Sequence, residues 1–482
     1  MKIKITFKHL FIITITIFYI RFIRSFIKSY KIHCFAHDEL LLTRCKNEIR
    51  NVMKDAWKNY YKHAWGYDFL NPLSRKGENL HGLGYTIIDS LDTLLIMDLD
   101  DEFQQARKWV NESMAFGDNV SFFEAVIRCV GGLMSAYELT KDQLFLEKAV
   151  KLGNLLMNAF KTETGLPRVL IDMKTGMLYD YPWNNESTLL SDAGSCQIEF
   201  LALSRYSGNY SYYNIATKAR VSLERLGPLP PTSINYNFLF PSKYEYSLDA
   251  FGDSYFEYLL KFKYYSPLND TNDEFQDAIN EAIYRMGFTS WETGLDYFAE
   301  IRGNSFLHRI SHLSFFLPGT LFLASIMYPE NEIYSKLASS LLQTGIYLYK
   351  MQPTKLGGEK ATFMKNYPFV KWDDDTYKLR PELFESMFYG WRIKHDPKLR
   401  YDAWKFFKAI EKYCSTGSGY STVHDTSKKV IVYDDIQDSF FLSETLKYLY
   451  LTFCDDDYFS IYDYVFTTQA HPLKRILYNK NK

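Results

Sequence analysis

Beyond about residue 45, apolar positions recur mostly three and four residues apart, and this spacing predicts amphipathic helices. The clearest run lies on one helical face and consists of Phe145, Ala149, Leu152, Leu156 and Phe160. Immediately before this run, Thr140, Lys141 and Asp142 supply a turn and a candidate helix cap. The pattern therefore predicts a helix that begins shortly after residue 142.

The same local pattern returns twice along the chain. A turn residue is followed by an apolar residue at +3, Ala at +7 and Lys at +9, starting from Asp142, Asn209 and Asp396. The first two starts lie 67 residues apart, and the third follows after about three such periods. A period near 60 residues is typical of two helices with their loops. Because no Pro/Gly/Ser-rich linker divides residues 45–475, we predict one large all-helical domain of helical hairpins.

The N-terminus is basic and then apolar. Three lysines among the first eight residues precede an apolar run from Leu10 to Ile20. This run is shorter than the roughly 17–25 residues of a spanning helix and suits a signal peptide. No small-residue cleavage site follows it, however, and if Arg21 snorkels the apolar stretch reaches about Ile27. We favour a signal anchor over a cleaved peptide, and either one predicts entry into the secretory pathway.

Composition narrows the class of protein. The 56 Lys and Arg against 57 Asp and Glu leave a net charge of -1, which gives no indication of a nucleic-acid partner. Aromatic residues make up 17% of the chain; a sugar-stacking surface would explain them, but we favour a genome-wide compositional bias. The six cysteines form no CxxC pair, which disfavours a zinc module. Phosphate-binding glycine loops, HExxH and GxSxG are absent from the sequence.

Candidate chemistry lies in acidic residues within apolar strings. Glu124, Asp253 and Glu444 are of this kind, and Glu382 and Glu385 share one face of a helix that Pro381 would begin. A buried carboxylate is costly unless it is paired, hydrogen-bonded or bound to a metal. Each could form an internal salt bridge, as Glu124 could with Arg128. If the hairpins close into a ring, however, the clusters converge on one acidic pit, which suits glycoside hydrolysis or a calcium ion.

Longer strings carry a family resemblance. From about Ala56 to Pro472 the chain resembles the class I α-1,2-mannosidases, glycoside hydrolase family 47. The strings, in family order, are residues 64–68, 82–94, 123–128, 131–133, 252–261, 379–382, 439–448 and 466–472. The resemblance implies an (α/α)7 barrel of helical hairpins plugged by a C-terminal β-hairpin. It also implies calcium-dependent, inverting hydrolysis of terminal α-1,2-linked mannose from high-mannose N-glycans.

The resemblance also implies roles for individual residues. Glu124 matches the acid, Glu382 the base and Asp253 a third essential carboxylate. Thr468 matches the protein ligand of Ca²⁺, bound through its hydroxyl and its own carbonyl, and Phe440 would stack on the sugar. The remaining implied substrate-binding residues are Arg128, Asp192, His312, Arg380, Glu385 and Glu444, of which Glu385 and Glu444 would also orient water around the ion.

Several positions depart from the family pattern. Gln469 stands where Glu is usual, which predicts weaker support for the ion, and Asp192 replaces a longer Glu. Phe315 and Gly345 occupy positions where many members carry a disulfide, so that bridge is expected to be lost. Phe251 stands where members have Arg or Leu, and the order of branch removal is therefore left open.

The resulting prediction is a monomeric processing mannosidase of the ER or early Golgi with a lumenal catalytic domain. The domains are expected at residues 1–45 (anchor or signal peptide plus stem), 46–475 (catalytic barrel) and 476–482 (polar tail). Five Asn-x-Ser/Thr sites are compatible with this route, at Asn111, Asn119, Asn185, Asn209 and Asn269. Two alternatives stay open: an ER degradation-enhancing mannosidase-like protein that marks misfolded glycoproteins, and a catalytically weak glycan-binding lectin.

Overall fold

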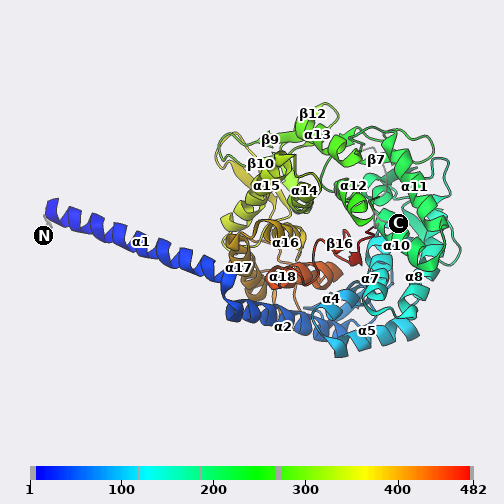
Figure 1. The fold of residues 1–482 in the computed structure, drawn as a ribbon, viewed down its shortest axis with the longest axis horizontal. Coiled ribbons are helices and arrows are strands. Elements are labelled where there is room, and N and C mark those ends of the chain that lie inside the picture. Colours follow the sequence, from blue (N-terminus) through cyan, green and yellow to red (C-terminus); the bar gives the residue numbers. More distant parts are fainter. Residues whose placement is uncertain (1–6, 118, 185, 268–272, 478–482) are drawn as a thin grey trace.

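The computed structural model describes residues 7–117, 119–184, 186–267 and 273–477. Asn185 and Asn269 lie outside these residues, as does most of the predicted polar tail. Asn111, Asn119 and Asn209 are exposed. A closed ring of helices, one layer inside another, forms the body of the structure (Figure 1).

Helical hairpins build this ring, each with one inner and one outer helix. The inner helices are α4 (Leu91–Ile96), α7 (Gly131–Thr140), α10 (Gln197–Ser207), α12 (Asp253–Tyr265), α14 (Leu317–Met327), α16 (Glu382–Lys394) and α18 (Leu446–Phe453). The outer helices are α5 (Asp100–Glu112), α8 (Gln143–Leu156), α11 (Ser211–Glu224), α13 (Glu274–Met286), α15 (Glu332–Met351), α17 (Pro397–Cys414) and α2 (Glu39–His63). Helix α2 packs on α18 and closes the ring. Within the described ranges this makes seven pairs of an inner and an outer helix, six of them hairpins and the seventh formed by the two ends of the chain, which confirms the predicted (α/α)7 barrel.

The repeat found in the sequence marks the starts of outer helices. Asp142 caps α8 by accepting a hydrogen bond from the Leu144 amide at 3.1 Å, and Asp396 caps α17 in the same way. Asn209 accepts from the Ser211 amide at the start of α11. The apolar residues at +3 and the alanines at +7 are all buried. The repeat is therefore a cap followed by the inward face of an outer helix.

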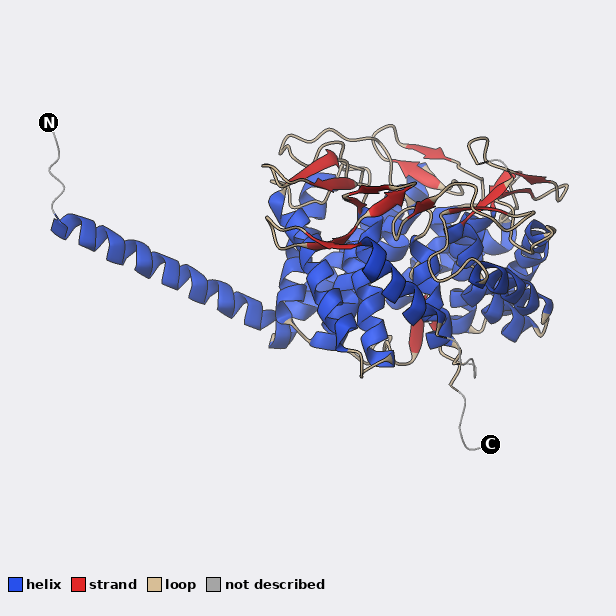
Figure 2. Cartoon of the chain, turned by 90° about the horizontal axis from the view of Figure 1, so that it is seen from above, coloured by secondary structure: helices blue, strands red, loops and turns tan. Residues whose placement is uncertain are grey.

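Short antiparallel strands cover one end of the barrel (Figure 2). They are β1 (Phe69–Asn71), β2 (Lys76–Glu78), β3 (Asn119–Ser121), β4 (Leu170–Asp172), β5 (Leu178–Tyr179), β6 (Ser187–Leu189), β7 (Ser233–Asn235), β8 (Glu245–Tyr246), β9 (Gly287–Thr289), β10 (Asp296–Phe298), β11 (Glu300–Arg302), β12 (Ser305–Leu307), β13 (Arg309–Ser311), β14 (Lys360–Phe363) and β15 (Val370–Asp374). The helical prediction missed them because runs of two to five residues are too short to show a period of two.

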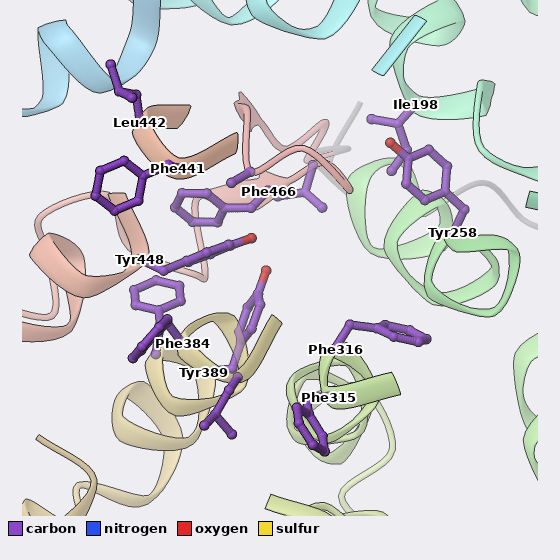
Figure 3. Close-up of a cluster of buried hydrophobic side chains, with 14 of the residues drawn as sticks. Ile198, Tyr258, Phe315, Phe316, Phe384, Tyr389, Phe441, Leu442, Tyr448 and Phe466 are labelled. Carbon is purple, nitrogen blue, oxygen red and sulfur yellow. The ribbon is translucent and has the colours of Figure 1, made fainter. Parts of the chain in front are cut away.

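A C-terminal hairpin fills the centre of the ring, as predicted. Its strands β16 (Tyr464–Phe466) and β17 (Pro472–Lys474) pair with Val465 opposite Leu473. The Phe466 ring packs against the rings of Phe388 and Tyr448, with centroids 5.4 and 6.0 Å apart (Figure 3). Burial of these aromatic faces holds the hairpin in the barrel.

Helix α1 (Phe7–His37) projects away from the barrel (Figures 1 and 2). Only its C-terminal end is seated: Phe35 is buried against Tyr401 and Phe453. Residues 18–31 of α1 are exposed. Among the described residues, no helix combines the length and the apolar character needed to cross a membrane.

Phe315 and Gly345, where the disulfide of the family was expected to be lost, face each other in the core. A Cβ atom on Gly345 would lie 3.3 Å from Cδ1 of Phe315 and 2.8 Å from Cδ1 of Leu383. The ring of Phe315, packed on the backbone of Gly345, thus stands where many family members are expected to have the disulfide. All six cysteines are unpaired, and five of them are buried.

Candidate active site

The acidic clusters meet in one cavity of about 350 Å³ inside the barrel. It is lined by seven carboxylic side chains, from Glu124, Asp192, Asp253, Glu257, Glu382, Glu385 and Glu444, and by two guanidinium groups, from Arg128 and Arg380. Phe440, Thr468 and Gln469 also line it. Of the predicted site residues, only His312 is not on the wall. The cavity is therefore strongly acidic, and the apolar ring of Phe440 forms part of its wall.

Glu382 opens α16 directly after Pro381, at the N-terminus of the helix. Nδ1 of His312 lies 2.7 Å from Oε2 of Glu382, and Nη1 of Arg380 lies 3.9 Å from Oε1 of Glu382. Burial opposes ionisation, but the hydrogen bond from His312 and the nearby guanidinium of Arg380 outweigh it and hold the pKa of Glu382 below its ordinary value. Glu382 is therefore a carboxylate at neutral pH.

His312 lies behind Glu382 and is almost fully buried, so it acts through that residue. Its Nε2 atom lies 2.6 Å from the Tyr349 hydroxyl. With that hydroxyl donating to Nε2, the imidazole carries its proton on Nδ1 and donates it to Glu382. Tyr349 gives no recognisable signal in the sequence, because a Tyr on a helix is most simply explained as core.

Glu124 lies at the start of η1 (Ala125–Val130), a wide helical turn that continues into α7. Nε of Arg128 donates to its Oε2 at 2.6 Å, the pairing that the i,i+4 spacing predicted. Nη1 of Arg128 also donates to Ser439 and Asp438, at 2.5 and 3.3 Å. Arg128 is thus fixed on three sides and holds the Glu124 carboxyl group at the cavity wall.

Two other carboxyl groups of the cavity have pKa values raised into the neutral range. Burial, reinforced by Asp249, Glu257 and Glu382, raises the pKa of Asp253 to about 7. Burial and the nearby Glu124 raise the pKa of Asp192 to about 8. A carboxylate base beside carboxylic acids is the arrangement that acid–base catalysis requires.

Another part of the cavity wall, with Thr468 and Glu444, fits a hard cation. Burial among other carboxylates raises the pKa of Glu444 well above its ordinary value, and no hydrogen bond to its side chain occurs among the described residues. Glu385 pairs with the buried Lys261 at 2.9 Å. No group of three His, Cys, Asp or Glu side chains in the described ranges is arranged to hold a metal directly. A cation here would use the Thr468 oxygens and water, with the carboxylates one layer further out.

Asp89, for which the sequence predicted no role, lies between these residues and Arg128, whose Nη1 is 3.5 Å from its Oδ2. It is completely buried, and its Oδ2 accepts from Ser443 at 2.9 Å, from the Gln469 amide at 3.1 Å and from Ser439. Its Oδ1 lies 3.2 Å from Nε2 of His471. Its position within Ile87-Ile88-Asp89-Ser90-Leu91 carried the same signal as the other acids. Because Gln469 donates here, a Glu at that position would face a carboxylate.

Three non-glycine residues beside the site have left-handed backbone. They are Phe251, Leu379 and Ala470, with φ of 73, 62 and 59°. Each lies within two residues of a cavity side chain: Asp253, Arg380 and Gln469. Such conformations are costly for side chains with a Cβ and cluster at functional sites. The surrounding structure therefore positions these cavity residues at the expense of local strain.

Comparison with known proteins decides the family. Residues 52–475 match the family described as Glycosyl hydrolase family 47. The chain belongs to glycosyl hydrolase family 47. As a family 47 protein it is a glycoside hydrolase. The mannosyl-oligosaccharide 1,2-alpha-mannosidase IA of Sus scrofa is 38% identical over 453 residues, which cover 90% of this chain and 68% of the relative.

Other family 47 relatives agree with this assignment. The mannosyl-oligosaccharide 1,2-alpha-mannosidase MNS1 of Arabidopsis thaliana is 36% identical, over 90% of this chain and 79% of its own length. The solved alpha-1,2-mannosidase from Trichoderma reesei superposes with a TM-score of 0.85 at 25% identity, covering 90% of this chain and 99% of that structure. The predicted resemblance and barrel are thus confirmed.

Proposed function

We propose that this glycoside hydrolase removes terminal α-1,2-linked mannose from high-mannose N-glycans. The relatives that share about 90% of the chain are named mannosyl-oligosaccharide 1,2-alpha-mannosidases. The observation that carries the proposal is the acidic cavity, where the ionised Glu382 faces carboxyl groups that hold protons at neutral pH.

In the proposed mechanism, Glu382 accepts a proton from the water that attacks the anomeric carbon. Glu124 donates a proton to the leaving oxygen, directly or through a water molecule. Asp253, whose pKa of about 7 leaves it about half protonated at neutral pH, hydrogen-bonds to the sugar or to that water. Attack from the face opposite the leaving group inverts the anomeric centre, which requires acid and base roughly 6.5–9.5 Å apart.

Calcium is the proposed cation of the Thr468 wall, where the residues fit a hard, oxygen-ligated ion. Thr468 would hold it through its hydroxyl and carbonyl, and Glu385 and Glu444 would orient its water. When bound, the ion binds sugar hydroxyls and polarises nearby water. The chain's own residues place the sugar: Phe440 offers an apolar face, and its ring centroid lies 5.8 and 5.7 Å from the Cζ atoms of Arg128 and Arg380.

We further propose a lumenal location in the ER or early Golgi, with α1 attached to a membrane and the barrel a monomer. The exposed part of α1 is apolar and basic, with no acidic residue before Asp38. In this proposal, residues 1–45 form the membrane segment and stem, residues 46–475 the catalytic barrel and residues 476–482 a polar tail. Pelleting with anionic vesicles that requires residues 1–37 would support it, and no difference on their deletion would contradict it.

The activity is tested with a high-mannose N-glycan, whose products are weighed by mass spectrometry with added Ca²⁺ or with a chelator. We expect stepwise loss of single hexoses with Ca²⁺ and little loss with the chelator. Glu382→Gln should abolish turnover while the glycan still binds, whereas the exposed Glu332→Gln should behave as wild type. Unchanged turnover in Glu382→Gln would refute the assignment of the base.

A further inference from the structure

The hairpin in the centre of the barrel carries Thr468 in the turn between β16 and β17. The amide of Ala470 closes this turn by donating to the carbonyl of Thr467 at 2.9 Å. Thr468 lines the cavity and is only partly buried. Within the described ranges its hydroxyl and carbonyl oxygens form no hydrogen bond, whereas its amide donates one. Thr468 therefore has two oxygen atoms available to a ligand at the cavity wall.

The amide of Thr468 is held by a tyrosine from another element. It donates to the hydroxyl of Tyr258 at 3.2 Å, the only hydrogen bond that Thr468 forms in the part of the chain that the structure describes. Tyr258 belongs to α12, is 2% exposed and does not line the cavity. Its hydroxyl points toward the central hairpin (Figure 3). Tyr258 thus contacts Thr468 from behind the cavity wall.

A buried acid orients the hydroxyl of Tyr258. This acid is Glu199 of α10, which is completely buried, and its Oε1 accepts from the hydroxyl at 2.5 Å. A tyrosine hydroxyl has one proton to donate and keeps its lone pairs for accepting. Because that proton is directed to Glu199, the lone pairs are available to the Thr468 amide. The three groups therefore form a chain in which each donates to the next.

The two residues after Thr468 are fixed from other helices. The side-chain amide of Gln469 donates to Asp89, the last residue of α3 (Tyr85–Asp89), at 3.1 Å. The carbonyl of Ala470 accepts from Lys447 of α18 at 2.8 Å. Neither contact holds the amide of Thr468, whose partner comes from α12 alone among the described residues. The contact with α12 therefore controls the position of Thr468 separately from the rest of the turn.

We propose that Tyr258, oriented by Glu199, is a positioning residue for the cation site, because its hydroxyl fixes the backbone that carries both oxygens of Thr468. This inference rests on the calcium site of the proposed function and adds two residues that do not touch the ion. A ligand group that is fixed before binding loses less conformational entropy when it binds. Since α12 also begins with Asp253, one helix places both this carboxyl group and Thr468.

The test uses Tyr258→Phe, which removes the hydroxyl and keeps the ring. Its matched control is Tyr264→Phe, since Tyr264 is a buried tyrosine of the same helix whose hydroxyl donates to the Ile461 carbonyl at 2.9 Å. Each variant loses one hydrogen bond to backbone, but only Tyr258→Phe frees Thr468. Ca²⁺ is titrated by calorimetry into full-length proteins from which a chelator has first removed metal.

We expect the Kd for Ca²⁺ to rise about tenfold in Tyr258→Phe, as for one lost hydrogen bond, and to stay unchanged in Tyr264→Phe. In chelator, the two variants should lose similar amounts in the midpoint of thermal unfolding. Added Ca²⁺ should raise that midpoint less in Tyr258→Phe than in the control. A role confined to packing would lower stability in both variants without this difference in affinity.

Equal Ca²⁺ affinity of Tyr258→Phe and wild type would overturn the inference, and so would an equal loss of affinity in both variants. Thr468→Ala locates the bound ion: binding that is unchanged in this variant, or absent from wild type, would overturn the inference together with the proposed cation site. If Tyr258→Phe alone binds Ca²⁺ more weakly while wild type releases no mannose from a high-mannose glycan, the inference stands and the proposed activity fails.

Discussion

Asp253→Asn tests whether the cavity holds a carboxylic acid at neutral pH. The folded protein holds the proton of Asp253 up to about pH 7, whereas the unfolded chain releases it near the ordinary value of 3.8. Between these pH values the folded state binds more protons, so rising pH destabilises it relative to the unfolded chain. Asn cannot ionise and removes this dependence.

The magnitude follows from the pKa. A difference of about three units corresponds to about 4 kcal/mol at full burial, at about 1.36 kcal/mol per unit. Asp253 lies at the cavity wall and is only half-buried, so solvent screening makes this an upper limit. Near pH 4 the variant should match the wild type, since Asn and a protonated Asp are nearly isosteric. By pH 7 the variant should be more stable, and the gap should then stay constant.

The assay is urea unfolding of both proteins at half-unit steps from pH 4 to pH 8.5, with chelator throughout so that no cation compensates the charge. The matched control is Asp455→Asn, because the Asp455 carboxylate is exposed. The difference in unfolding free energy between this variant and the wild type should not change with pH. A stability gap that does not change with pH, or that shrinks as pH rises, would refute the environment derived for Asp253.

The remaining predictions concern the groups around the cavity. His312→Leu should raise the pKa of Glu382, because the hydrogen bond from the imidazole is lost, and should move the acidic limit of kcat/KM to higher pH; an unmoved limit would contradict the support assigned to His312. Gln469→Glu should lower the unfolding free energy in chelator by roughly 1–3 kcal/mol, because it replaces the donor to the buried Asp89 by a second carboxylate. Added Ca²⁺ should restore part of the lost stability, and a variant more stable than wild type in chelator would contradict the prediction. Phe315→Ala should cost about 3–5 kcal/mol of unfolding free energy in denaturant titrations. A reductant should leave the thermal midpoint of the wild type unchanged, since its cysteines are unpaired, and a fall in that midpoint would reveal a disulfide.

Much of the barrel is predictable because its determinants are local. The caps at Asp142 and Asp396 and the apolar residues after them recur along the chain, and each describes one hairpin without reference to the others. The acids of the site were found for the same reason, because a carboxylate within an apolar string such as that around Glu124 is costly unless it has a role. The same criterion would have found Asp89 and the buried Lys261, which lie in strings of this kind.

Other features depend on contacts that no local pattern contains. His312 contacts Glu382 and Tyr349 contacts His312, each from a different element, and only the closed ring shows that the imidazole lies behind the base instead of on the cavity wall. The strain at Phe251 likewise follows from tertiary contacts, because nothing in its neighbours in sequence demands a left-handed backbone.

The central claim is that Glu382 activates a water molecule against an α-1,2-mannosidic bond. The most direct measurement is proton NMR of the full chain with α-1,2-mannobiose and Ca²⁺, following the anomeric signals before mutarotation. The account predicts that β-mannose appears first, that Glu382→Gln releases none, and that α-1,3- and α-1,6-mannobiose remain intact. Release of α-mannose first, or equal release by the Glu382→Gln variant, would contradict it.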